Sequence, residues 1–259
     1  MRKMTLITGA SSGLGKDFAT EYAKANQDLI LVARRLDRLH KLKNELEALY
    51  PITVLVYQVD LSDPIQTQTF LDQLPADLFV YRLINNAGFG YHGAFGNYPH
   101  ETVTSMIEVN IAAVTRLTAY FIPKMKEQNE GEILNIASMA AFTPGPYMAE
   151  YYATKAYVLS FSMALHEELK PFGIKVSASC PGPTRTEFGQ AAQYKHNDGI
   201  EQKMSMASLP VVKMSMKALE KNRNVAVPGL SNQCLRVLML FTPKNISAKV
   251  IKIIQKQRF

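Results

Sequence analysis

The stretch Thr8-Gly9-Ala-Ser-Ser-Gly13-Leu-Gly15 decides the fold of this 259-residue chain. It follows the apolar run Met4 to Thr8, which is typical of a buried strand, and it opens a helical pattern formed by Leu14, Phe18 and Tyr22. A glycine turn in this position offers bare backbone N–H groups and the positive end of a helix dipole to phosphate oxygens. The alternative is an ordinary strand-to-helix turn, but position and spacing favour a dinucleotide-binding turn.

Short β-branched runs recur along the chain and alternate with amphipathic stretches. This alternation predicts a parallel sheet with helices on both faces, joined by right-handed crossovers. We therefore expect an α/β fold, a single doubly wound Rossmann domain over residues 1–259 with a seven-stranded parallel sheet. The seven runs are Met4 to Thr8, Leu29 to Ala33, Thr53 to Val59, Leu78 to Ile84, Glu132 to Ala137, Lys175 to Ser179 and Val225 to Val227.

Two long helical segments and one irregular segment complete the predicted organisation. The helical segments, roughly Glu101 to Gln128 and Tyr151 to Pro171, either cover the sheet or pair with a second subunit. Residues 183–210 are rich in polar residues and also hold Met204 and Met206. We interpret them as a substrate lid, because a long irregular segment with flexible methionines suits a mobile cover better than a strand.

The composition indicates a globular chain in a reducing compartment. Hydrophobic residues make up 47% of the chain and charged residues 20%, so a packed core is expected. The two cysteines, Cys180 and Cys234, are too few for a disulfide framework. Because the first residues run straight into a strand-like stretch, we expect no signal peptide, and the apolar run Val237 to Phe241 is too short to cross a bilayer. We expect a cytoplasmic protein.

The positive charge is concentrated at the end of the chain. The formal net charge is +7, yet no Asp or Glu follows Glu220. Residues 244–259 are expected to form a basic amphipathic helix, with Ile246, Val250, Ile253 and Ile254 on one stripe and lysines off it. This helix either packs on its own domain or a sister subunit with a solvated basic face, or contacts an anionic membrane surface or acidic partner. Nucleic-acid binding ranks last because no binding motif accompanies the charge.

Several further motifs follow the glycine turn in a fixed order: Asn85-Asn86-Ala87-Gly88, Asn110, Ser138, Tyr151-x-x-x-Lys155, and Pro181-Gly182 with Thr186. With Thr8-Gly9-x-x-x-Gly13-x-Gly15 they resemble the short-chain dehydrogenase/reductase family over about residues 3 to 186. The resemblance implies a nicotinamide-dependent oxidoreductase that forms a homodimer or homotetramer. It also implies cofactor contacts from Gly9, Ser11, Ser12, Gly13, Leu14, Gly15, Asp60, Leu61, Asn86, Ala87, Gly88, Tyr151, Lys155, Pro181, Gly182, Thr184 and Thr186.

The end of the second predicted strand indicates which nicotinamide cofactor is used. An acidic side chain there would accept from the ribose 2′-hydroxyl and repel a 2′-phosphate. This chain instead has Arg34 and Arg35, and guanidinium groups suit a phosphate dianion. NADP(H) is therefore expected. The alternative is that both arginines merely begin a solvated basic helix with Arg38 and Lys41.

Hydride transfer between a nicotinamide and a carbonyl or secondary alcohol requires an acid/base at the substrate oxygen, and Tyr151 is the candidate. A free phenol has a pKa near about 10, and lowering it by about three units takes roughly 4 kcal/mol. Lys155 lies one helical turn away and could supply part of that stabilisation. Tyr152 is a rival, but the family motif selects Tyr151; Tyr147 is a pocket or packing residue.

Two polar residues complete the predicted catalytic set. Ser138 is expected to hold the substrate oxygen by a hydrogen bond, and the resemblance implies that Asn110 positions a water linking Lys155 to solvent. Taken alone, Ser138 could be a simple turn residue and Asn110 a polar group inside a helix. The predicted catalytic residues are thus Asn110, Ser138, Tyr151 and Lys155, without a metal, since no cluster has metal-ligand spacing.

Apolar residues that follow the motifs indicate what kind of substrate the protein binds. Phe89, Phe142, Met148 and Phe188 would line a pocket for a fairly apolar carbonyl or alcohol, although each could equally belong to the core. The leading hypothesis is a carbonyl reductase acting on a keto compound or aldehyde. The alternative is a catalytically silent NADP(H)-binding sensor or interaction protein on the same fold, but such a protein has no need of the acid/base pair.

Overall fold

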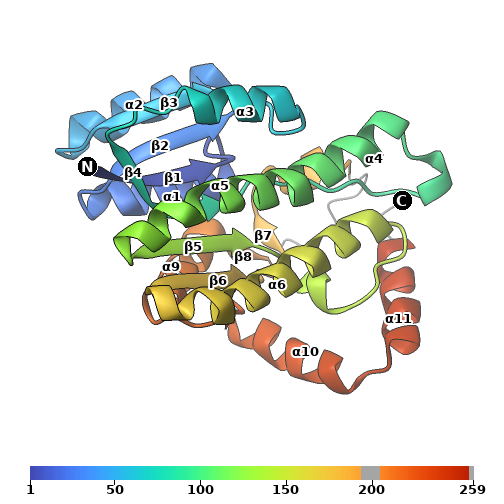
Figure 1. Ribbon diagram of the computed structural model, residues 1–259. Coiled ribbons are helices and arrows are strands. Elements are labelled where there is room, and N and C mark those ends of the chain that lie inside the picture. Colours follow the sequence, from blue (N-terminus) through green and yellow to red (C-terminus); the bar gives the residue numbers. More distant parts are fainter. Residues whose placement is uncertain (194–204, 257–259) are drawn as a thin grey trace.

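The computed structural model describes residues 1–193 and 205–256. Its main sheet has the strand order β3-β2-β1-β4-β5-β6-β9, and every neighbouring pair is parallel (Figure 1). The predicted seven-stranded, doubly wound α/β fold is confirmed. The strands are β1 (Arg2–Thr8), β2 (Asp28–Ala33), β3 (Val54–Gln58), β4 (Leu78–Asn85), β5 (Gly131–Ile136), β6 (Ile174–Ser179) and β9 (Val225–Ala226).

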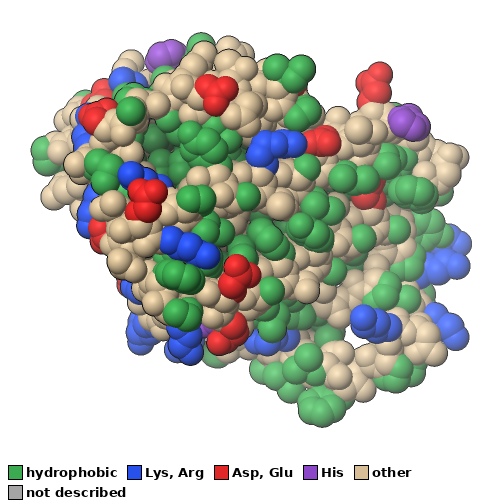
Figure 2. Space-filling view, in the orientation of Figure 1, with side chains coloured by type: hydrophobic (Ala, Val, Ile, Leu, Met, Phe, Trp, Pro, Cys, Tyr) green, Lys and Arg blue, Asp and Glu red, His purple; other side chains and the backbone are tan. Residues whose placement is uncertain are grey.

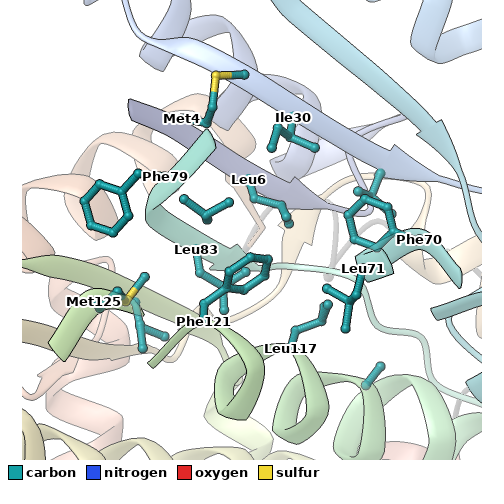
Figure 3. Packing of buried hydrophobic residues seen from close by; sticks show 14 of the residues in the cluster. Met4, Leu6, Ile30, Phe70, Leu71, Phe79, Leu83, Leu117, Phe121 and Met125 are labelled. Atoms are coloured by element: carbon teal, nitrogen blue, oxygen red, sulfur yellow. The ribbon is translucent and has the colours of Figure 1, made fainter. Parts of the chain in front are cut away.

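Helices cover both faces of this sheet. One face packs against α3 (Pro64–Asp72), α5 (Ala113–Gln128) and α6 (Ala149–Leu169), through a core that includes Phe70, Leu117 and Phe121 from the helices and Leu6 and Leu83 from the strands (Figure 3). The other face packs against α1 (Gly13–Lys24), α2 (Leu36–Leu49) and α9 (Ser208–Glu220). Burial of these apolar side chains is the main force that holds the layers together.

The predicted long helix from Glu101 to Gln128 is interrupted. The structure has α4 (His100–Ile107), a π-helical turn η2 (Glu108–Ala112) and then α5. The extra residue in a π turn shifts the helix face by about a third of a turn, and such turns are frequent at functional sites. Here it carries Asn110, which is fully buried.

Parallel strands bring their carboxyl ends to one edge of the sheet, and that edge collects the sequence motifs. The glycine turn follows β1, Asn86 to Gly88 follow β4, Ser138 follows β5, and Pro181 follows β6. In open α/β sheets, ligands bind at this edge, where the strand order reverses. The reversal lies between β1 and β4, next to the glycine turn.

Two predicted segments, the substrate lid over 183–210 and the terminal helix over 244–259, can be compared with the observed elements. Within residues 183–210 the structure has β7 (Thr184–Arg185) paired with β8 (Met206–Ala207), and α7 (Phe188–Ala191); residues 194–204, with Met204, lie outside the described residues. The predicted helix over 244–259 corresponds to α11 (Lys244–Lys256), and residues 257–259 again lie outside. Across the described ranges, no helix has both the length and the apolar character needed to cross a membrane.

A buried charge ladder crosses three neighbouring strands. Arg82 on β4, Glu132 on β5 and Lys175 on β6 stand opposite one another in register. Arg82 Nε donates to Glu132 Oε2 at 2.7 Å, and Lys175 Nζ donates to Glu132 Oε1 at 3.1 Å. Burial acts to raise the pKa of Glu132, but the two cations outweigh it and hold that pKa below its usual value.

Removing the carboxylate of this ladder should cost much stability. We predict that Glu132→Ala lowers the free energy of unfolding by about 3–5 kcal/mol, because the buried Arg82 guanidinium loses its counter-ion. Urea denaturation measures the change. The control is Glu130→Ala, which breaks an exposed pair with Lys3 and should cost about 1 kcal/mol or less. If both substitutions lowered the free energy of unfolding equally, the Glu132–Arg82 pair would not be the stabilising contact that we infer.

Candidate active site

The turn after β1 is shaped by close backbone contacts that only glycine permits. Gly9 and Gly13 have φ angles of +66° and +53°. A Cβ atom on Gly9 would lie 2.9 Å from Ala87 Cα, and one on Gly15 would lie 2.3 Å from the Gly9 carbonyl oxygen. Ser12, the N-cap of α1, makes no side-chain capping bond, so the first N–H groups of that helix remain available to an anion. The turn therefore fits the phosphates of a dinucleotide.

Hydrogen bonds join the residues after β4 to Thr8, the residue that precedes the glycine turn. Thr8 Oγ1 accepts hydrogen bonds from the backbone N–H groups of Asn86 (3.0 Å) and Ala87 (2.9 Å), and Asn86 Nδ2 donates to the Thr8 carbonyl (2.9 Å). Gly88 then passes so close to the catalytic candidates that a Cβ atom there would lie 3.1 Å from Lys155 Nζ. The structure thus places Asn86, Ala87 and Gly88, which are predicted cofactor contacts, between the glycine turn and α6.

Arg35 lies on the glycine turn. Its Nη2 atom donates to Ser11 Oγ at 3.0 Å and to Ser12 Oγ at 2.8 Å, and its Nη1 atom donates to Glu187 Oε2 at 2.8 Å. Arg38 donates to the other Glu187 oxygen at 2.7 Å. Hydrogen bonds from Arg38 and Arg35 lower the pKa of Glu187 to about 2. Arg35 does stand at the start of α2, as the alternative expects, but its side chain also bonds the two serines of the glycine turn.

Arg34 lies on the other side of the same strand end. It lines an open hollow together with Gln58, Asp60 and Gln66. The Asp60 carboxylate accepts from the backbone N–H and the hydroxyl of Ser62, at 2.9 and 2.7 Å. Leu61, the neighbour of Asp60 and also a predicted cofactor contact, is buried in the core and does not line this hollow.

The segment after β6 covers the glycine turn. Pro181 is buried, and Thr184 Oγ1 donates to the Gly182 carbonyl at 2.9 Å. The Thr186 side chain lies against Gly13, where an added Cβ atom would be 3.1 Å from Thr186 Cβ. Of the predicted cofactor residues in this segment, the structure places Thr186 against the glycine turn.

Tyr151 and Lys155 occupy successive turns of α6 and both are buried. Lys155 Nζ donates to the Ile136 carbonyl at the end of β5 (2.8 Å) and lies 5.9 Å from the centre of the Tyr151 ring. The Ser138 side chain lies close enough to the Tyr151 hydroxyl to act on its pKa, and Ser138 Oγ accepts from the Ala140 backbone N–H at 3.1 Å. The structure therefore brings Ser138, Tyr151 and Lys155 together.

Burial dominates the acid/base properties of this pair. It raises the pKa of the Tyr151 hydroxyl, and the nearby Ser138 side chain opposes that rise only in part. It lowers the pKa of Lys155 to about 8. We expected Lys155 to lower the pKa of Tyr151; in this structure burial outweighs any such effect. At neutral pH Tyr151 is a phenol, which is a proton donor.

Asn110 holds two elements of the site together. Its Nδ2 atom donates to the Phe89 carbonyl at 2.9 Å and to Thr154 Oγ1 at 3.0 Å, while Oδ1 accepts from the Phe89 backbone N–H at 3.1 Å. The π turn therefore links the chain after β4 to α6. The water relay expected from the resemblance stays a prediction. Thr154 carried no sequence signal of its own.

Apolar side chains surround the tyrosine. Phe89, Met148 and Phe188 pack with Tyr151 in one cluster, and the Phe188 and Tyr151 ring centres are 5.2 Å apart. Phe142 instead belongs to a separate cluster, which Met239 of α10 (Leu230–Phe241) also contacts. Three of the four residues considered for an apolar pocket thus gather around the candidate acid.

The rival tyrosine faces another way. The Tyr152 hydroxyl accepts a hydrogen bond from Gln255 Nε2 of α11 at 3.2 Å. Tyr147 offers its backbone carbonyl to Gly93 N–H and to the Tyr98 hydroxyl, which fits a packing role. The structure favours Tyr151, because it is the tyrosine that meets Ser138.

The sheet with its phosphate-binding turn, and the polar cluster at the same edge, define a dinucleotide-dependent oxidoreductase that transfers a hydride. The sequence profile of the short chain dehydrogenase family matches residues 3–197. The chain belongs to this family, as its motifs predicted, and members of the family bind a nicotinamide cofactor.

Among curated proteins, the chain is similar to the very-long-chain 3-oxoacyl-CoA reductases of Mus musculus and Coprinopsis cinerea. The mouse protein is 32% identical over 199 residues, which is 71% of this chain and 60% of the mouse protein. The fungal protein is 34% identical over 174 residues, which is 66% of this chain and 51% of the fungal protein. The matched part thus spans between half and two thirds of these relatives.

Two solved structures resemble the chain over almost its whole length. A short-chain dehydrogenase from Sphingobium yanoikuyae in complex with NADPH is 32% identical, with a TM-score of 0.81 and coverage of 94% of this chain and 96% of that one. A bulky-bulky ketone specific alcohol dehydrogenase from Comamonas testosteroni is 30% identical, with a TM-score of 0.78 and the same coverage.

A methyl group in the glycine turn should disturb cofactor binding. We predict that Gly15→Ala weakens nicotinamide cofactor binding by about tenfold or more, because its Cβ atom would meet the Gly9 carbonyl and force the turn to shift. Fluorescence titration with the reduced cofactor measures this. The control is Gly96→Ala, where an added Cβ atom meets nothing within 4 Å. Unchanged affinity in a folded Gly15→Ala protein would rule out this turn as the phosphate site.

Proposed function

We propose that this protein is an NADP(H)-dependent carbonyl reductase in which Tyr151 is the acid/base. The observation that carries the proposal is the buried arrangement of Tyr151, which lies beside Ser138, with Lys155 one turn away. These groups lie at the sheet edge that also holds the glycine turn. Because its pKa is raised, the Tyr151 hydroxyl is protonated at neutral pH, so it is present in the form needed to reduce a carbonyl.

The residues divide the reaction between them. A nicotinamide cofactor held at the glycine turn would supply the hydride for the carbonyl carbon. Tyr151 donates its hydroxyl proton to the carbonyl oxygen, so that the carbonyl becomes an alcohol, and Ser138 holds the same oxygen by a hydrogen bond. The Lys155 ammonium stabilises the tyrosinate that remains. Asn110 fixes the chain on both sides of the site through Phe89 and Thr154.

Three arginines support the choice of NADP(H). Arg35 already bonds two serine hydroxyls of the glycine turn and the Glu187 carboxylate, and Arg38 bonds the same carboxylate. A carboxylate held between two guanidinium groups marks a position where a 2′-phosphate would also be favourable. Arg34 lines the adjacent hollow. The similar Sphingobium yanoikuyae enzyme was solved with NADPH.

The substrate proposed here is a bulky or long-chain apolar ketone or aldehyde. Phe89, Met148 and Phe188 form an apolar wall beside Tyr151. The names of the similar proteins, reductases of 3-oxoacyl-CoA and an alcohol dehydrogenase specific for bulky ketones, fit the same class.

A homodimer or homotetramer is part of the proposal. Exposed apolar side chains lie on the helices that cover one face of the sheet: Ile107 on α4, Tyr120 on α5, and Tyr157 and Met163 on α6. Such a surface suits a second copy of the chain.

Tyr151→Phe tests the acid/base role. We predict that it lowers the kcat of ketone reduction by about 100-fold or more, because the proton donor is lost, while NADPH affinity is kept. NADPH oxidation followed by absorbance, with a panel of ketones and aldehydes, measures the rate. Tyr152→Phe is the matched control and should change kcat by less than about threefold. If the wild type binds NADPH but reduces no carbonyl, a silent cofactor sensor replaces the proposal.

Arg35→Ala tests the cofactor preference. We predict that it raises KM for NADPH by about tenfold or more and leaves KM for NADH nearly unchanged, because only NADPH carries the 2′-phosphate. The control on the same helix is Lys41→Ala, an exposed residue that should alter neither value. An equal rise of both KM values would show that Arg35 shapes the turn and does not read the phosphate.

A further inference from the structure

The last two helices form an arm outside the helical layers of the domain. This C-terminal arm consists of α10 (Leu230–Phe241) and α11 (Lys244–Lys256), and it lies at the lower right of Figure 1. Of the twenty large hydrophobic side chains that are exposed among the described residues, ten belong to the arm. They are Leu230, Leu235, Val237, Leu238, Leu240, Phe241, Ile246, Val250, Ile253 and Ile254.

Helix α11 turns its polar side toward the protein. Ser247 and Gln255 are its buried residues: Ser247 Oγ accepts from Thr143 Oγ1 at 2.7 Å, and the Gln255 carbonyl lies 3.0 Å from His92 Nε2. The apolar stripe faces out instead, with Ile246 and Val250 about half exposed and Ile253 64% exposed. A helix that packed on its own domain for stability alone would bury that stripe.

Helix α10 also presents apolar side chains to the outside. Asn232 and Met239 face the domain, where Asn232 Nδ2 donates to the Pro228 carbonyl at 2.7 Å and Met239 packs on a buried cluster. The outward side presents Leu238 (63% exposed) and Phe241 (83% exposed). Figure 2 shows hydrophobic side chains gathered over this helix at the bottom of the molecule, with basic side chains beside them.

The positive charge of the arm indicates which kind of partner can bind its exposed apolar surface. Four exposed lysines lie on α11, at positions 244, 249, 252 and 256, and the sequence has no Asp or Glu after Glu220. Self-association of this surface about a two-fold axis would bring like charges together. An anionic lipid surface can bind both the apolar side chains and the lysines of the arm. The acyl chains contact the apolar side chains, and the negative headgroups pair with the lysines.

We infer that the C-terminal arm docks on the surface of an anionic membrane, with its apolar residues in the headgroup boundary and its lysines at the phosphates. This inference goes beyond the proposed reaction and does not depend on it. Neither helix crosses the bilayer; both lie along it.

A single fluorescent residue tests the docking directly. The chain has no tryptophan, so Phe241→Trp gives a signal from the arm alone. We expect its emission to shift to the blue, and brominated lipids to quench it, on vesicles that contain phosphatidylglycerol but not on pure phosphatidylcholine. The control is Leu49→Trp at the end of α2, also exposed, which should not respond. No response from Phe241→Trp on anionic vesicles would overturn the inference.

Charge reversal provides the second test. Lys249→Glu/Lys252→Glu/Lys256→Glu should lower co-flotation with anionic vesicles by about tenfold or more, as should raising the salt concentration. Lys41→Glu/Lys170→Glu/Lys221→Glu makes the same change of net charge on exposed lysines away from the arm and should lower it by less than about twofold.

Circular dichroism and NADPH titration check that both charge-reversal proteins fold. Three results would overturn the inference: equal loss in both proteins, equal flotation with neutral vesicles, or an Ile253→Ser substitution that abolishes dimers and leaves vesicle binding unchanged. The last result would assign this surface to a second copy of the chain.

Discussion

The hydrogen bond from Lys155 Nζ to the Ile136 carbonyl is the contact on which the candidate site depends. It fixes α6 against the end of β5 and places a buried cation at the carboxyl edge of the sheet. Tyr151, one turn earlier on α6, then meets Ser138, the residue that follows β5 by two positions. The burial that this packing requires also sets the chemistry, because it raises the pKa of Tyr151 and lowers that of Lys155 to about 8.

Three consecutive residues after β7 contact the glycine turn, the arginines at the start of α2 and Tyr151, all at the carboxyl edge of the sheet. Thr186 lies against Gly13 of the glycine turn, Glu187 pairs with Arg35 and Arg38, and Phe188 packs on Tyr151. The proposed cofactor and substrate regions are thus covered by one short segment. The substrate lid over residues 183–210 stays a prediction.

Local sequence patterns predicted most of the fold and of the candidate site. Most of the features that they did not predict depend on contacts between residues far apart in the sequence. The seven strands are short β-branched runs, and glycine and tyrosine motifs have spacings that fix their chemistry. The π turn at Asn110 was missed because its residues all suit a helix. The pairing of Arg35 with Glu187 joins residues 152 positions apart, which no local pattern reveals. The outward stripe of α11 likewise depends on the partners of Ser247 and Gln255.

The pH dependence of carbonyl reduction tests the central claim most directly. Because burial raises the pKa of Tyr151, the phenol stays protonated through neutral pH, whereas Lys155 loses its proton above a pKa of about 8. The kcat/KM for ketone reduction with saturating NADPH should therefore be level below neutral pH and fall as the pH rises through about 8. A rate that increases with pH across that range would contradict a phenol proton donor supported by a lysine ammonium.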